Sequence, residues 1–177
     1  MNRIAQHPSS ATRAFNALLW TAQVLWGVLF GMSGFGKVLA YDPTIWRHML
    51  HQVAWFSALP QGLFVFIGVC EGLGGVALIA PAVTRVAPKL TPIAAAGLAI
   101  IMILAAGFHI ARGEYSFFVP LNALLAGGAA LIAYGRLAIP IEPARAGALR
   151  VLTGMAVFGA LAVGGFAPVL YQSAHMH

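Results

Sequence analysis

The chain has 177 residues, of which 60% are hydrophobic and 8% are charged, and its mean hydropathy is +0.87. A soluble domain carries roughly 25% charged residues, so this composition excludes an ordinary soluble protein and indicates an all-α integral membrane protein. The net charge of +6 does not require a nucleic-acid partner, because basic residues in short loops mark the cytoplasmic side and bind anionic head groups. Cys70 is the only cysteine, which excludes an intramolecular disulfide and a CxxC redox pair.

The N-terminal part of the chain predicts a mobile segment followed by a membrane span. Residues 1–13 are polar and basic, and we expect a flexible cytoplasmic N-terminus. Residues 14–37 are apolar, long enough to span a bilayer, and too long for the apolar core of a signal peptide. Ser33 and Lys37 are spaced i, i+4 near the end of this span, where the stem of Lys37 can reach the interface.

Residues 41–60 are too polar and too short to span a membrane. Asp42 followed by Pro43 predicts the start of a helix. The aromatic and basic side chains that follow suit a helix lying in the interface, and a connecting helix that caps the bundle is an equal alternative. These side chains are Trp46, Arg47, His48, His51 and Trp55.

The rest of the chain predicts further spans within one membrane domain of residues 14–170. The second span is expected to end at Pro81, because proline disrupts a helix interior. A fifth span, which carries no charge in its apolar run, would be added to a four-helix core. The expected spans after the first are residues 62–80, 92–111, 117–138 and 149–170, followed by a short tail of residues 171–177.

Glu71 is the only charged residue of the second span and lies near its middle. A carboxylate at membrane depth is unfavourable by several kcal/mol unless it is paired, protonated or facing a wet cavity. Gly68, Gly72 and Gly75 share the helical face of Glu71, and small residues allow another helix to approach closely. Glu71 should therefore point into the bundle and is a candidate functional residue.

The distribution of basic residues predicts the orientation. Seven of the ten Lys and Arg residues fall on the side of the N-terminus, which favours a cytoplasmic N-terminus and an outside C-terminus in a bacterial-type inner membrane. With this topology the polar residues of several segments fall in the outer half of the membrane, and the inner half of the spans contains almost none. The outer group is Lys37, His48, His51, Glu71, His109 and Asn122.

The outer polar residues support two interpretations. In the functional one, Glu71 and His109 are catalytic and exchange protons, because burial moves the pKa of both residue types toward neutrality. The ligand-binding candidates are then Lys37, Asn122, Ser33, Trp46, His48 and His51. In the alternative, the polar side chains of Glu71, Ser33, Asn122 and Lys37 bond one another and only fix helix packing. Imidazole and carboxylate can bind metals, but no HExxH or ExxH motif is present, so we expect no metal site.

Four stretches resemble the DoxX-like membrane proteins. They are FGMSGFGKVL at residues 30–39, GVCEGLGGVALI at 68–79, MILAAGFHIARG at 102–113, and residues 122–126, and the resemblance covers about residues 15–138. The resemblance implies a four-helix bundle to which the fifth span is added. It singles out Lys37, Glu71, His109 and Asn122 as the positions that match the motifs of the family. It also implies a link to quinol oxidases and thiosulfate:quinone oxidoreduction.

The chain has no haem or flavin motif, so it would be at most a subunit of a quinone-linked oxidoreductase. The resemblance then predicts a quinone-related or redox-associated membrane subunit, with no intrinsic cofactor, a quinone as ligand and a redox partner subunit. A small-molecule or proton-coupled transporter that uses Glu71 and a non-catalytic scaffold remain as alternatives.

Overall fold

The computed structural model describes residues 9–141, so the predictions for residues 1–8, 149–170 and 171–177 lie outside the described residues. Within residues 9–141 every regular element is a helix, and four helices are long and apolar enough to cross a membrane. The predicted all-α membrane bundle is therefore confirmed.

The first helix, α1 (Ser10–Leu39), begins earlier and ends later than the sequence suggested. Ser9 caps it by accepting a 3.1 Å hydrogen bond from the backbone N–H of Thr12, which satisfies one of the free N–H groups of the first turn. A helix of 30 residues is about 45 Å long at 1.5 Å per residue. It exceeds the hydrocarbon thickness of about 30 Å, so its ends reach the polar head-group regions of a bilayer.

Two short helices follow α1, namely α2 (Pro43–Gln52) and the 3-10 helix η1 (Ala54–Ala58). Asp42 caps α2 as predicted, because its carboxylate accepts hydrogen bonds from the backbone N–H groups of Thr44 at 2.8 Å and Ile45 at 3.1 Å. These bonds, led by the one from Ile45, lower the pKa of Asp42 below its ordinary value. No residue of α2 is buried, so this helix lies on the outside of the bundle.

The remaining long helices are α3 (Gln61–Thr84), α4 (Leu90–Ala111) and α5 (Phe118–Ala138). The prediction that the second span ends at Pro81 was wrong, because α3 continues to Thr84. Pro81 has no N–H to donate to the carbonyl of Ala77. The hydroxyl of Thr91 from α4 donates to that carbonyl instead, at 3.3 Å. The carbonyl that Pro81 leaves without a helical hydrogen bond therefore has a partner, and α3 continues beyond the proline.

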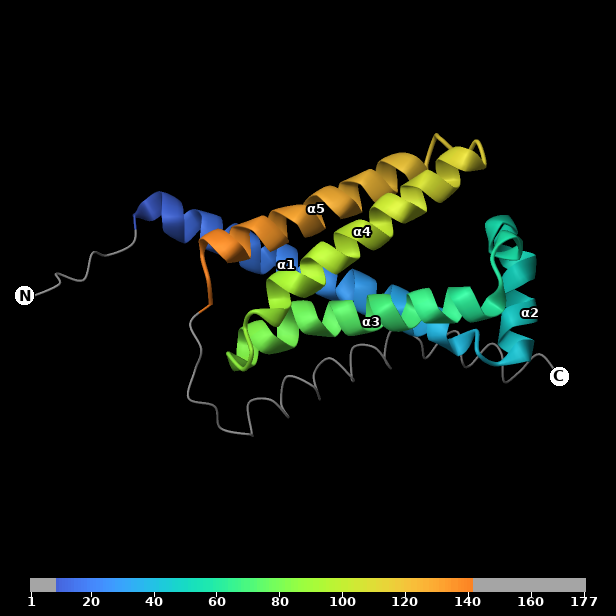
Figure 1. Ribbon diagram of the computed structural model, residues 1–177, viewed down its shortest axis with the longest axis horizontal. Helices are drawn as coiled ribbons and strands as arrows, with labels where there is room; N and C mark the ends of the chain where they lie inside the picture. The colour runs from blue at the N-terminus through green and yellow to red at the C-terminus, as the bar shows by residue number, and fades with distance from the viewer. Residues whose placement is uncertain (1–8, 142–177) are drawn as a thin grey trace, which may run out of the picture.

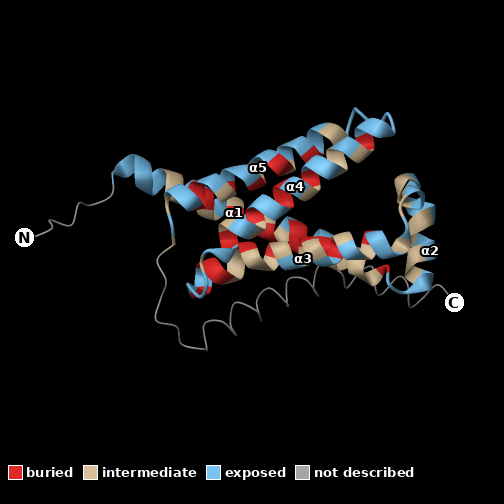
Figure 2. Ribbon diagram, in the orientation of Figure 1, coloured by how far each residue is buried: buried red, intermediate tan, exposed pale blue. Residues whose placement is uncertain are grey.

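The four long helices form two pairs, α1 with α3 and α4 with α5, and the pairs meet along α3 and α4 (Figure 1). The buried positions follow the inner faces of these helices (Figure 2). Small and large apolar side chains alternate in the core, and many large apolar side chains on the outer faces are exposed, as expected for helices that contact lipid. The core includes Phe30, Leu78, Leu98, Met102, Ala129 and Ile132.

The two ends of the bundle differ in chemistry. At one end, which we call the capped end, α2 and η1 lie beside the C-terminal ends of α1 and α4 and the N-terminal ends of α3 and α5 (Figure 1). The opposite end contains the start of α1, the α3–α4 connection and the end of α5. We call it the basic end after its charged residues, which are Arg13, Arg85, Lys89 and Arg136.

Candidate functional site

Glycines bring α1 and α3 into backbone contact near the capped end. A Cβ atom on Gly34 would lie 2.2 Å from the backbone nitrogen of Gly72 and 2.5 Å from the carbonyl oxygen of Gly68. A Cβ on Gly75 would lie 2.6 Å from the carbonyl oxygen of Gly27. The small-residue faces of the two helices therefore pack against each other, as small-xxx-small patterns do in membranes.

This close approach places three predicted residues together. The Nζ of Lys37 lies 2.6 Å from Oε2 of Glu71, and the Ser33 hydroxyl donates to the same oxygen at 2.8 Å. Lys37 also donates to the Ser33 hydroxyl at 2.6 Å. The side chain of Glu71 is 3% exposed and that of Lys37 is 17% exposed. Lys37 thus turns into the bundle to neutralise Glu71, which differs from the expected extension to the interface.

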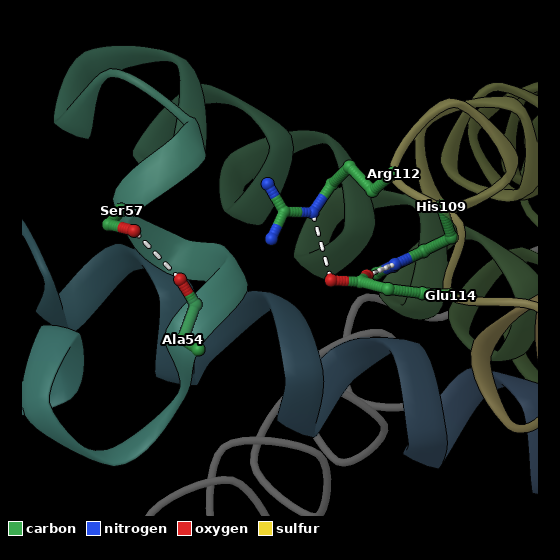
Figure 3. Close-up of polar contacts among 5 residues, drawn as sticks. All are labelled: Ala54, Ser57, His109, Arg112 and Glu114. Carbon is green, nitrogen blue, oxygen red and sulfur yellow. Dashed lines mark hydrogen bonds and ion pairs between the residues drawn. The ribbon is translucent and has the colours of Figure 1, made fainter.

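The end of α4 holds a second polar group (Figure 3). Nδ1 of His109 lies 2.5 Å from Oε2 of Glu114, and Nε of Arg112 donates to Oε1 of Glu114 at 3.0 Å. Hydrogen bonding to His109, followed by Arg112, lowers the pKa of Glu114, so this carboxylate is ionised at neutral pH. An ionised carboxylate only accepts hydrogen bonds, so Nδ1 of His109 carries the proton and Nε2 is left for other contacts.

Sequence reasoning missed Glu114 as a partner of His109. The residue in the sequence that could have indicated this pairing is Gly113, which has a φ of 75° and turns the chain back at the end of α4. The backbone N–H of Glu114 then donates to the carbonyl of His109 at 2.9 Å, which returns the carboxylate to the ring. Glycine is favoured in this left-handed conformation because it has no Cβ.

Aromatic rings enclose His109. The ring of Phe118 from α5 stacks on the imidazole at a centroid distance of 4.3 Å and an interplanar angle of 9°. Trp55 from η1 meets the imidazole edge-on at 5.2 Å and also contacts Phe118 at 6.2 Å. Trp55 therefore links η1 to the ends of α4 and α5, and only 3% of His109 is exposed.

Asn122 lies one turn after Phe118 on α5 and is 8% exposed. Within residues 9–141 its side-chain amide shares no hydrogen bond with His109 or Glu71. The amide atoms are not fully enclosed, because Nη2 of Arg136 is the one fully buried side-chain nitrogen or oxygen without a partner among the described residues. Asn122 thus differs from Ser33 and Lys37, which both bond to Glu71.

Of the residues predicted on the interfacial segment, Trp55 contacts His109, whereas His48, His51 and Trp46 make no contact with either polar group in the described chain. His48 contacts Gln52 at 2.7 Å on the exposed surface of α2, and His51 is exposed. Trp46 packs on Phe64 of α3 with ring centroids 5.3 Å apart. No group of three His, Cys, Asp or Glu residues within the described range is arranged to hold a metal ion.

The expectation of an almost apolar inner half was wrong. Gln23 on α1 and Arg136 on α5 are both buried near the basic end, and Nε of Arg136 donates to Oε1 of Gln23. The amide of Gln23 donates in turn to the carbonyl of Leu78 at 2.8 Å. Arg136 belongs to the last turn of α5, within the predicted span of residues 117–138, and its burial was not predicted.

The fold and the two polar groups define a small polytopic membrane protein with a four-helix core. Comparison with protein families matches residues 21–133 to the DoxX-like family, which covers more than half of the chain. The chain belongs to the DoxX-like family. Comparisons with curated proteins and with solved structures give no match.

Proposed function

We propose that this protein is a redox-associated membrane subunit that binds a quinone-type aromatic carbonyl compound at the capped end. The observation that carries the proposal is the environment of His109, whose imidazole is fixed by Glu114, stacked on Phe118 and covered by Trp55. Flat aromatic walls suit a flat ring. Nε2 of His109 is the position that would bond a carbonyl or exchange its proton.

Asn122 supports the same ligand chemistry. The residue is 8% exposed, and its amide makes no hydrogen bond within residues 9–141. A second ligand carbonyl would give this amide an acceptor. The electrons for any redox reaction of the bound quinone would come from a partner subunit in the same bilayer.

The Lys37–Ser33–Glu71 group supports a structural role within this proposal. The carboxylate of Glu71 is already paired with Lys37 and Ser33, next to the glycine contact that holds α1 and α3 close together. We therefore assign proton exchange to His109 and helix pairing to Glu71. In the scaffold hypothesis, all polar groups of the protein have only such a structural role. The following experiment distinguishes the scaffold from a quinone-binding subunit.

The test is the thermal stability of the purified protein with and without a short-chain quinone, for wild type, His109→Gln and His48→Gln. Ligand binding raises the free energy of unfolding by RT ln(1 + [L]/Kd), about 2.7 kcal/mol at a hundredfold excess over Kd. We expect His109→Gln to lose most of this increase. His48→Gln should keep it, because His48 lies on exposed α2 and contacts only Gln52 within the described chain.

Each outcome has a clear meaning. Equal stabilisation of wild type and His109→Gln would exclude His109 from the site. The absence of stabilisation in wild type would favour the scaffold hypothesis, in which the polar groups only hold helices together.

A further inference from the structure

Arg136 is a buried cation for which no carboxylate lies within reach in the described chain. The residue is 3% exposed in the last turn of α5. The acidic residues within residues 9–141 are Asp42, Glu71 and Glu114, and all three lie toward the capped end. There they are matched by Arg47, Lys37 and Arg112 respectively. The described part of the basic end therefore has cations and no compensating carboxylate.

Neutral side chains hold the guanidinium in place. Nε donates to Oε1 of Gln23, and Nη1 donates to Oδ1 of Asn16 at 2.7 Å. The contact of Gly135 with Leu19 sets the spacing between α5 and α1, since a Cβ on Gly135 would lie 2.3 Å from Leu19 Cδ2. Both amide carbonyls come from α1, so the orientation of the guanidinium is fixed by a helix other than its own.

The far edge of the guanidinium has no hydrogen-bond partner among residues 9–141. Nη2 is buried and makes no hydrogen bond within this part of the chain. A guanidinium has five N–H donors, and the bonds to Gln23 and Asn16 leave free donors on both Nη1 and Nη2. These two nitrogens form the edge that binds the paired oxygens of a phosphate or carboxylate. A charge buried without a counterion is strongly unfavourable.

We propose that Arg136 is an anion-binding site that takes a phosphate group at its Nη1–Nη2 edge. The half-buried indole of Trp20 lies over the guanidinium, with the ring centroid 5.0 Å from Cζ. Because Nη2 is buried, a phosphate oxygen reaches it only when neighbouring side chains move. The phosphate comes either from an anionic phospholipid or from solution. This site lies at the opposite end from His109 and does not depend on the proposed quinone site.

The experiment measures the melting temperature of the detergent-purified full chain during titration with phosphatidylglycerol, with phosphatidylcholine, or with inorganic phosphate. We expect a saturable rise with an anionic titrant and none with phosphatidylcholine. Arg136→Lys keeps the charge but loses the planar edge, so it should raise the half-saturating concentration about tenfold. Lys89→Gln removes an exposed charge at the same end and should change it by less than about twofold.

The titrants distinguish the source of the phosphate. A rise with phosphatidylglycerol alone assigns a lipid head group, and an Arg136-dependent rise with inorganic phosphate assigns an anion from solution. Tryptophan fluorescence gives a second readout, since the change on binding should disappear in Trp20→Phe. If Arg136→Lys fails to fold, Asn16→Ala replaces it, because loss of the Nη1 contact should weaken binding severalfold.

Two results would overturn the proposal. One is no saturable response of wild type to any anion, and the other is an equal response in wild type and Arg136→Lys.

Discussion

Lys37 of α1 and Glu71 of α3 form a partly buried ion pair in which Nζ and Oε2 are 2.6 Å apart. The Ser33 hydroxyl donates to the same carboxylate oxygen. The pair lies where Gly34 contacts Gly68 and Gly72, so the charges are neutralised at the point of closest helix contact. Mutations of Lys37 and Glu71 can measure the contribution of this pair to stability separately from ligand binding.

We predict that Glu71→Gln lowers the free energy of unfolding by about 1–3 kcal/mol, because it leaves the charge of the partly buried Lys37 without its partner. Lys37→Gln should have a similar effect. The double variant should be destabilised by clearly less than the sum of the two, since neither charge remains. Denaturation of the three variants in the same detergent measures this coupling. Additive effects would contradict the ion pair.

The glycine contact gives a prediction with a matched control. Gly34→Ala should destabilise the protein by more than about 1 kcal/mol, because the new methyl group overlaps backbone atoms that cannot move independently. Gly127→Ala on α5 has no neighbouring atom within 4 Å of the new Cβ. It should be neutral or stabilising by up to about 1 kcal/mol, since alanine favours the helix. Thermal unfolding compares them, and equal effects would disprove the close packing.

The pH dependence of stability should contain a contribution from Glu114. Its pKa in the folded protein is lowered from the ordinary value of 4.5, first by His109 and then by Arg112. The stabilisation is therefore present above pH 4.5 and is lost as the pH falls through the lower folded value. Melting temperatures measured from about pH 6 to pH 3 should fall less steeply in Glu114→Gln. Asp42→Asn, which removes the other carboxylate with a lowered pKa, provides the comparison.

The capping residues and small-residue faces show what could be predicted from the sequence. Asp42 and Pro43 predicted the start of α2, and the glycines around Glu71 predicted its burial, because both signals act over a few neighbouring residues. The pairing of Glu71 with Ser33 and Lys37 was one of the alternatives, since i, i+4 spacing placed both on one face of α1.

The missed contacts depend on how the helices are arranged in space. The course of α3 through Pro81 depends on Thr91 of the next helix, and the burial of Arg136 depends on Gln23, 113 positions away in the sequence. The pairing of His109 with Glu114 depends on the left-handed turn at Gly113. A single sequence does not specify which distant side chains will meet, so these contacts required the structure.

Asn122 provides a prediction in which stability and binding change in opposite directions. The residue is 8% exposed, and its amide makes no hydrogen bond within residues 9–141. Asn122→Leu keeps the number and branching of the side-chain heavy atoms and replaces a mostly buried amide with methyl groups, so it should raise the free energy of unfolding of the ligand-free protein by up to about 1 kcal/mol. Asn16→Leu is the control and should be destabilising, because Asn16 accepts a hydrogen bond from Arg136.

The same variant tests the role proposed for Asn122 in ligand binding. If its amide donates to a quinone carbonyl, Asn122→Leu should weaken quinone binding about tenfold, which corresponds to the loss of one hydrogen bond of about 1.4 kcal/mol. Quinone titrations followed by melting temperature measure this change. A more stable variant with unchanged quinone affinity would remove Asn122 from the site, whereas a less stable variant would show that the amide has a structural partner. Greater stability with weaker binding is the combination expected of a residue kept for a ligand.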